Sequence, residues 1–310
     1  MKNSIRVAVI GAGKLGSKHA EVYSRLPGVD LVGVCDIDLP RAKEIARRCK
    51  TTAYGDHRAL LGAVDAASIV VPSRLHHEIS KEFLKSRAHI LVEKPMTATL
   101  EEADDLLRTA AENGRLIQVG HIERFNSAIR TIRGIIRSPR FIECHRLGSY
   151  DPRVTDVGVT LDLMIHDIDI VLDLLRSPVE HVDAVGARIL SKSEDIANAR
   201  IRFANRCVCD LTASRVSAEV MRKIRIFQDD AYLSLDYVTQ EALIYTKENG
   251  RIRHKKIDIK KSDSLKEELA DFIDCARHER KPLVSGEEGR EALALALEIS
   301  RQISQSQSGN

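Results

Sequence analysis

The sequence predicts an α/β fold in two parts: an N-terminal doubly wound parallel sheet and a C-terminal α+β domain with a largely antiparallel, open-faced sheet. Up to about residue 120, short apolar runs alternate with amphipathic stretches, which is the pattern of βαβ units. The first apolar run leads directly into a glycine-rich turn and a helical pattern. Beyond about residue 121 this alternation stops, and strand-like runs follow one another closely.

In the N-terminal part, strands and helices take turns along the chain. The expected strands are residues 5–10, 29–35, 52–54, 67–71, 90–92 and 116–119. The expected helices between them are residues 14–25, 41–48, 76–86 and 100–112, where apolar residues recur at helical spacing. We assign residues 1–121 to this domain, which has the arrangement of a parallel sheet wound on both faces.

The C-terminal part, residues 122–310, begins with one strongly apolar helix at 160–175. Strand-like segments then follow at 184–190, 199–203, 208–213, 224–228, 232–235 and 242–245, separated by polar or turn residues. Two helices, 264–278 and 287–303, flank a break at Lys281-Pro282 and close the chain. We expect the last helix to be able to pack back on the first domain.

Composition narrows the functional classes. At 310 residues the chain can form two domains, and no apolar run approaches the ~20 residues of a membrane span. The formal charge of +3 comes from 48 basic and 45 acidic residues that are interspersed, which does not indicate nucleic-acid binding. No secretory signal is recognisable, and six cysteines without a Cys-x-x-Cys motif make a zinc site unexpected and favour a cytoplasmic location.

The turn after the first strand carries a dinucleotide-binding pattern. Gly11, Gly13 and Gly16 form G-x-G-x-x-G, with Lys14 and Leu15 opening the helix whose N-terminus faces the anion. Asp36 ends the second strand, where a carboxylate can bind ribose hydroxyls and would repel a 2′-phosphate. The pattern predicts a Rossmann domain that binds NAD rather than NADP. The alternative is a glycine turn without a ligand and a solvated Asp36.

Further polar residues follow other strands of the predicted sheet. These are Pro72-Ser73, Glu93-Lys94-Pro95 and Gly120-His121, with His76 opening the next helix. Ligands of open parallel sheets bind beyond the carboxyl ends of the strands, so we expect these residues to border one crevice. We expect the cofactor to be contacted there by Pro72, Ser73, His76, Glu93 and Lys94. Pro95 restricts Lys94 to an extended conformation and fixes where its ammonium group is presented. Taken singly, a lysine at such a position is more often a solvated one.

The helix at 160–175 carries a polar stripe in an apolar surrounding. Asp162, His166, Asp169 and Asp173 recur at spacings of four, three and four, which places them on one helical face. An aspartate one turn before a histidine can accept one imidazole N–H and leave the other nitrogen to take a proton. The pattern indicates a general base with an orienting carboxylate. An ordinary helix-surface pair and, less favoured, a metal site are the alternatives; we predict no metal.

Taken together, the Gly11–Gly16 turn, Asp36, Glu93-Lys94-Pro95, the Gly120–Asn126 turn and the Asp162/His166 helix resemble the Gfo/Idh/MocA oxidoreductases in matching order. The resemblance covers nearly the whole chain. It implies that Lys94 is catalytic and that His166 and Asp162 lie beside the nicotinamide and the reacting hydroxyl. In this family the peptide bond that corresponds to Lys94-Pro95 is often cis. Two positions depart from the pattern: Ser73, where many members have asparagine near the nicotinamide, and Ser127, where proline is frequent.

The resemblance also implies a substrate class. The segments 120–126 and 156–169 are similar to those of members that oxidise C3 of UDP-N-acetylglucosamine, which supply a 3-keto sugar to a PLP-dependent aminotransferase for lipopolysaccharide or glycan biosynthesis. Lys94, His121, Arg124, Arg153, Asp162 and His166 are the expected substrate contacts, the two arginines at the diphosphate. A free-sugar or inositol dehydrogenase and a non-catalytic NAD-binding regulator remain alternatives. We expect a homo-oligomer.

Overall fold

The computed structural model describes residues 4–150, 157–248 and 250–308. Contacts divide the chain into two compact units. Unit 1 runs to Ile122 and includes Asp263–Arg290, and unit 2 consists of Glu123–Ser262 and the residues from Glu291 onward. The break after Ile122 lies next to the expected boundary at residue 121. The later segment that returns to unit 1 contains the penultimate helix, whereas most of the last helix belongs to unit 2.

Unit 1 contains the predicted doubly wound parallel sheet. Its six strands lie in the order β3-β2-β1-β4-β5-β6, all parallel, so the strand order reverses between β1 and β4. The strands are β1 (Ile5–Ile10), β2 (Val29–Cys35), β3 (Thr52–Tyr54), β4 (Ala66–Ile69), β5 (His89–Glu93) and β6 (Ile117–Gly120). The helices are α1 (Lys14–Tyr23), α2 (Leu39–Cys49), α3 (His76–Lys85), α4 (Leu100–Asn113) and α7 (Ser264–His278).

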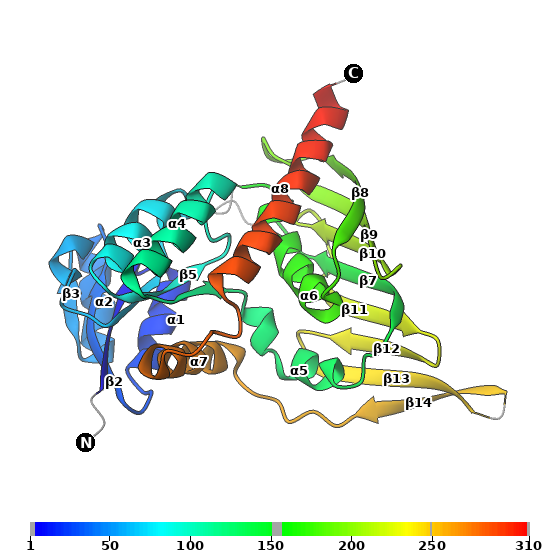
Figure 1. Cartoon of the computed structure of the whole chain (residues 1–310), viewed down its shortest axis with the longest axis horizontal. Coiled ribbons are helices and arrows are strands. Elements are labelled where there is room, and N and C mark those ends of the chain that lie inside the picture. The colour runs from blue at the N-terminus through cyan, green and yellow to red at the C-terminus, as the bar shows by residue number, and fades with distance from the viewer. Residues whose placement is uncertain (1–3, 151–156, 249, 309–310) are drawn as a thin grey trace. The chain divides into compact units, whose positions relative to one another are not determined.

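Local signals explain where these helices begin and end. Thr99 and Glu102 form a reciprocal capping box at the start of α4, and Gly114 ends the helix in the left-handed conformation. Asp263 caps α7 by accepting the amides of Leu265 and Lys266. Helix α7 packs beside α1, although their first residues, Lys14 and Ser264, lie 250 positions apart in the sequence (Figure 1).

Unit 2 is built on an eight-stranded sheet in the order β14-β13-β12-β11-β7-β10-β9-β8. Only the β7–β10 pair is parallel, so the sheet is largely antiparallel, as predicted. The strands are β7 (Pro139–Leu147), β8 (Val179–Ala187), β9 (Ile196–Phe203), β10 (Val208–Ser214), β11 (Met221–Gln228), β12 (Ala231–Asp236), β13 (Glu241–Glu248) and β14 (Arg251–Ile257). The helices are α5 (Ser127–Arg133), α6 (Ile165–Leu175) and α8 (Gly286–Ser308).

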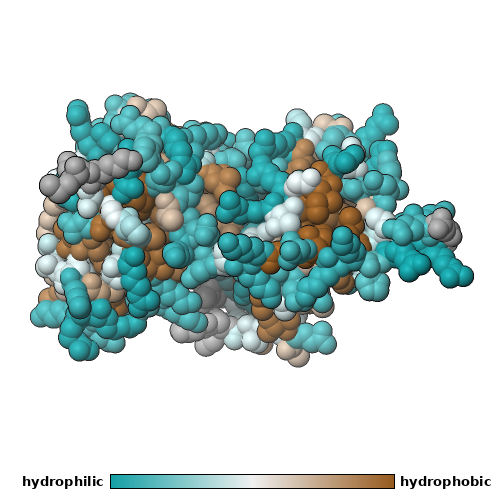
Figure 2. All heavy atoms as spheres, turned by 90° about the horizontal axis from the view of Figure 1, so that it is seen from below, coloured by the Kyte–Doolittle hydropathy of each residue, from teal (hydrophilic) through white to brown (hydrophobic). Residues whose placement is uncertain are grey.

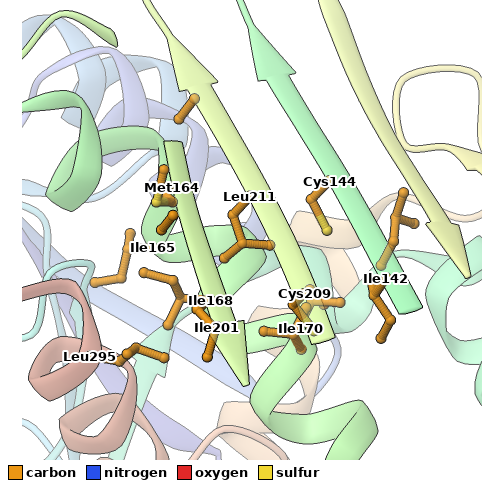
Figure 3. Close-up of a cluster of buried hydrophobic side chains, with 14 of the residues drawn as sticks. Ile142, Cys144, Met164, Ile165, Ile168, Ile170, Ile201, Cys209, Leu211 and Leu295 are labelled. Carbon is orange, nitrogen blue, oxygen red and sulfur yellow. The ribbon is translucent and has the colours of Figure 1, made fainter. Parts of the chain in front are cut away.

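One face of this sheet is covered by helices and forms the core of unit 2. Met164, Ile165, Ile168 and Ile170 pack against Ile142, Cys144, Cys209, Leu211 and Ile201 of the strands, together with Leu295 of α8 (Figure 3). Most of these side chains are fully buried. Cys207 and Cys209 are also buried in this core, and both thiols are free. The sheet therefore fixes α6, which carries the candidate base.

The sequence pattern does not predict α5 or the strands β7 and β14. The inward-facing residues of β7 include Ile142, Cys144 and Arg146, and the apolar Phe141 faces the other side of the sheet. The strand therefore lacks a regular alternation of apolar and polar residues. In β14 nearly every residue is exposed, including Arg251, Arg253 and Lys255, and no hydrophobic pattern marks it. Figure 2 shows the hydrophilic surface of the β13–β14 hairpin at its tip. Within the described residues, no helix is long and apolar enough to cross a membrane.

Candidate cofactor and catalytic sites

Of the three glycines in the turn of unit 1, only Gly13 has room for a side chain. Gly11 has φ +104°, and a Cβ there would lie 2.2 Å from the carbonyl oxygen of Val70. A Cβ on Gly16 would lie 1.9 Å from the carbonyl oxygen of Gly11, whereas nothing lies within 4 Å of a Cβ on Gly13. No side chain caps α1, and its first turn has no acidic residue. Open space before an uncapped helix N-terminus fits the pyrophosphate of a dinucleotide.

Asp36 is held at the edge of this turn by the main chain. Its carboxylate accepts the Ala12 amide at 2.7 Å and the Asp38 amide at 2.8 Å, and the side chain is half-buried. These two bonds fix the carboxylate at the carboxyl end of β2, next to the glycine turn. Asp38, the competing candidate, instead caps α2 by accepting the Arg41 amide. The arrangement fits ribose recognition by Asp36, with two backbone bonds fixing the carboxylate in place.

Lys94 follows β5 and is half-buried, and its peptide bond to Pro95 is cis. His76 lies next to it with 1% exposure, Nδ1 2.8 Å from the Pro95 carbonyl and Nε2 2.9 Å from the Val71 carbonyl. Burial lowers the pKa of His76. His76 therefore contacts the main chain at the ends of two strands with both ring nitrogens, a role that its prediction as a cofactor ligand did not include. Pro72 is exposed and Ser73 half-buried at the end of the same β4 loop.

Glu93 and His121 lie in the interior beside Lys94. A carboxylate oxygen of Glu93 lies 3.3 Å from Nε2 of His19, which is fully buried on α1. A Cβ on Gly120 would lie 2.7 Å from the same carboxylate, so a larger residue there would displace the Glu93 side chain. His121 is 1% exposed. Glu93 thus links the end of β5 to α1 and lies against β6, and no sequence pattern predicts the role of His19.

In unit 2, the candidate base follows a π-helical turn. Residues Thr160–Met164 form this turn and α6 begins at Ile165, where one continuous helix over 160–175 was expected. The amide of Ile165 reaches back to the carbonyl of Thr160, so the turn holds one residue more than an α-helical turn. Asp162 lies in the π turn and His166 in the first turn of α6, and both are half-buried. The assignment of Asp162 as orienter of His166 stays a prediction.

The second half of the predicted polar stripe is buried against arginines. Arg124 is 4% exposed, and its guanidinium lies 3.1 Å from carboxylates of both Asp169 and Asp173. A diphosphate contact by Arg124 stays a prediction. Arg146 donates two bonds of 2.9 Å to Asp167 and one of 3.0 Å to Glu123. These buried pairs fix α6 to β7 and to the 123–126 turn.

A loop between β8 and β9 holds the start of the π turn. Glu194 is 8% exposed, accepts the amide of Thr160 at 3.3 Å, and lies where a Cβ on Gly158 would clash. Its neighbour Asp195 is fully buried, accepts three successive amides from Ile189 to Ser191, and bonds Arg215 at 2.9 Å. These hydrogen bonds lower the pKa of Asp195 well below its usual range, although burial acts in the opposite direction. The backbone before Asp162 is therefore anchored by buried carboxylates.

The structure thus brings the predicted residues together in two groups. The Gly11–Gly16 turn, Asp36, the residues after β4, Lys94 and His121 lie in unit 1, at or next to the carboxyl ends of the parallel strands. Asp162 and His166 lie in unit 2 on the π turn and α6. Arg153 lies outside the described residues. Within the ranges that the structure covers, no group of three histidine, cysteine or carboxylate residues is arranged to hold a metal ion.

Comparison with known families covers both units. A model described as an oxidoreductase family with an NAD-binding Rossmann fold matches residues 5–121. A second model, described as the GFO/IDH/MocA C-terminal domain, matches residues 127–234.

Individual relatives extend this match to the whole chain. A UDP-N-acetylglucosamine 3-dehydrogenase of Acidithiobacillus ferrooxidans is 36% identical over 302 residues, 95% of this chain and 96% of that protein. A solved structure of the UDP-N-acetylglucosamine 3-dehydrogenase from that organism superimposes with a TM-score of 0.92, covering 97% of this chain and 98% of the other. A myo-inositol 2-dehydrogenase of Thermotoga maritima is 25% identical over 327 residues, 98% of each chain.

Proposed function

Since the chain belongs to the Gfo/Idh/MocA family of NAD-binding oxidoreductases, we propose that it oxidises the 3-hydroxyl of UDP-N-acetylglucosamine to a ketone with NAD. The observation that carries the substrate assignment is the 36% identity to a UDP-N-acetylglucosamine 3-dehydrogenase along almost the full length of both chains. The inositol dehydrogenase named above is less similar, at 25% identity. The 3-keto product is a substrate for a PLP-dependent aminotransferase, which we propose as the next enzyme in the pathway.

The geometry of unit 1 supports NAD as the cofactor. Gly13 leaves room for the pyrophosphate, and the first amides of α1 can donate hydrogen bonds to it. Asp36 would hold the adenosine ribose and disfavour a 2′-phosphate by charge repulsion. When bound, NAD supplies the hydride acceptor. The chain's own contribution is to orient the substrate and to handle the proton and the charge at its oxygen.

We assign the transfer of the hydroxyl proton to His166 and the stabilisation of the negative charge on the substrate oxygen to Lys94. His166 accepts the hydroxyl proton, Asp162 orients its imidazole, and the Lys94 ammonium stabilises the alkoxide that develops as the proton leaves. The half-buried setting of all three side chains fits this assignment, since each remains accessible to a ligand. His121 and Arg153 remain proposed substrate contacts. For Arg124 we favour a positioning role, because its guanidinium is paired with two carboxylates of α6.

The central experiment supplies the purified protein with NAD and UDP-N-acetylglucosamine, and with glutamate and a 3-keto-sugar aminotransferase to remove the product. Alcohol oxidation by NAD is unfavourable near neutral pH, so the trap makes turnover visible. We expect NADH formation that requires the UDP-sugar, and a 3-amino sugar identified by NMR. NADH formation with a free sugar or inositol instead would establish the alternative dehydrogenase. Bound NAD without turnover on any of these substrates would identify a regulator.

The catalytic assignment is tested with His166→Asn and Lys94→Ala. Loss of a general base should lower kcat by about 10²- to 10⁴-fold, and both substitutions should affect turnover far more than the dissociation constant of NAD. His145→Asn is the matched control, because His145 lies on the outer sheet face of the same unit and pairs with Glu143 at 2.8 Å. Near-normal turnover of either catalytic variant would remove that residue from the mechanism.

We further propose a cytoplasmic homo-oligomer that pairs through the sheet face opposite α6. On this face a row of rings runs from Phe141 through Phe227, Tyr232 and Tyr245 to His254, with centroid separations of 4.6–5.7 Å. Charges of both signs flank the row, among them Glu143 and Arg225. A face with both signs can complement a second copy of itself. Light scattering should give a multiple of the monomer mass, and Tyr232→Glu should lower it.

A further inference from the structure

His76 is engaged by the main chain on both sides of its ring. It opens α3, directly after the short turn Ser73–Leu75 that follows β4. Nδ1 lies 2.8 Å from the Pro95 carbonyl oxygen, and Nε2 lies 2.9 Å from the Val71 carbonyl oxygen. Val71 follows β4 and Pro95 follows β5, and these two strands are paired neighbours. The imidazole therefore spans the ends of two adjacent strands.

The neutral ring can donate a hydrogen bond to only one of the two carbonyl oxygens. A neutral imidazole has a single N–H, so one nitrogen donates and the other presents a lone pair to a carbonyl oxygen. Burial disfavours the doubly protonated ring and lowers the pKa of His76, and this effect outweighs the hydrogen bonds to the Pro95 and Val71 carbonyls, which act to raise the pKa. At neutral pH one of the two carbonyls thus receives the hydrogen bond.

Burial indicates which carbonyl this is. The contact to Pro95 is fully buried, whereas the contact to Val71 is partly open, and Val71 itself is half-buried. Water can satisfy the Val71 carbonyl, but a Pro95 carbonyl without its donor would remain unpaired in the interior. The tautomer with the proton on Nδ1 is therefore favoured, and it donates to the residue that directly follows Lys94.

We propose that His76 is a positioning residue for Lys94: its Nδ1–H holds the Pro95 carbonyl, and with it the main chain of Lys94, against the end of β4. This inference rests on the proposed catalytic role of Lys94. It replaces the expectation that His76 contacts the cofactor, because both ring nitrogens contact carbonyls of this chain. A shift of the Lys94 backbone should lower turnover, because a displacement of about 1 Å in an active site can cost about a hundredfold in rate.

Two near-isosteric variants separate the two nitrogens. In His76→Asn the amide nitrogen takes the place of Nδ1 and can still reach Pro95, whereas in His76→Gln it takes the place of Nε2 and reaches only Val71. We expect kcat to fall about tenfold to about hundredfold in His76→Gln and His76→Leu, and to stay within about threefold of wild type in His76→Asn. The KM for NAD should be nearly constant in all three. A merely structural defect would lower kcat and raise the KM for NAD together, or change neither.

His77→Leu is the control on the same helix. His77 is partly buried and pairs with Asp105 at 2.7 Å, on the side of α3 that faces α4. Its loss should change thermal stability and leave kcat unaltered. Equal turnover of the Asn, Gln and wild-type proteins would overturn the inference, as would equal loss in both. Lys94→Ala, measured alongside, tells the two failures apart: if it retains turnover, the proposed role of Lys94 fails, whatever His76 does.

Discussion

Unit 1 and unit 2 each present candidate site residues, but they hold them by different means. In unit 1 the main chain does most of the positioning: glycines allow close approach, amides hold Asp36, and carbonyls hold His76. In unit 2 buried side-chain ion pairs do it, with Arg146 on Asp167 and Glu123, and Arg124 on Asp169 and Asp173. The candidate site residues of unit 1 are thus fixed by backbone geometry, and α6 of unit 2 is fixed by charge.

The difference has an energetic consequence. In unit 1 the partners of Asp36 and His76 are main-chain amides and carbonyls, which no side-chain substitution removes. A buried ion pair depends on both partners, because removing one leaves an uncompensated charge in the interior. We therefore expect single charge-removing substitutions to damage unit 2 more than unit 1.

The largest effect should come from Arg146→Met. Its side chain is 3% exposed and serves two buried carboxylates, so its loss should lower the free energy of unfolding by about 3–5 kcal/mol. Arg140→Met is the control on the same strand, since Arg140 pairs with Asp229 in an exposed position and its loss should matter far less. Urea denaturation gives the free energy of unfolding of both variants. Similar stability of the two variants would contradict the view that buried charge holds unit 2.

A smaller effect is expected at acid pH in unit 1. His89 is 4% exposed, and burial, helped by Arg115, lowers its pKa from 6.5 to about 4. The unfolded chain then binds the extra proton between these values, so the free energy of unfolding should fall as pH drops from about 6.5 to about 4. The full contribution is up to about 3 kcal/mol. His89→Gln should make the free energy of unfolding depend less on pH in this range. Part of the dependence should remain, because the pKa of His76 is also lowered.

How far the sequence predicts this protein also differs between the units. In unit 1 the strand, glycine turn and Asp36 follow from local patterns, and the resemblance adds a role for Lys94. In unit 2 the Asp162 and His166 pair is recognisable, but the π turn and the partners of Asp167 and Asp169 are not. Arg146 lies on a strand that no apolar alternation marks, and Glu194 is 34 residues from the Thr160 amide that it accepts. Pairings over such distances depend on tertiary structure that no local pattern encodes.

The smallest change tests the backbone mechanism of unit 1 directly. Gly13 has an ordinary φ of −68°, and a methyl group there would meet no protein atom, so Gly13→Ala should fold with unchanged thermal stability. The methyl group would instead occupy the space assigned to the pyrophosphate and raise the dissociation constant of NAD about tenfold to about hundredfold.

Gly16→Ala is the matched variant with the opposite expectation. Its Cβ would lie 1.9 Å from a backbone oxygen, so the turn must rearrange and the melting temperature should fall. Calorimetry and NAD titration on both variants distinguish a glycine that leaves room for the cofactor from a glycine that is needed for packing within the protein. Normal NAD affinity in Gly13→Ala would show that the open position beside the turn is not where the cofactor binds, and the backbone account of this half of the site would have to be abandoned.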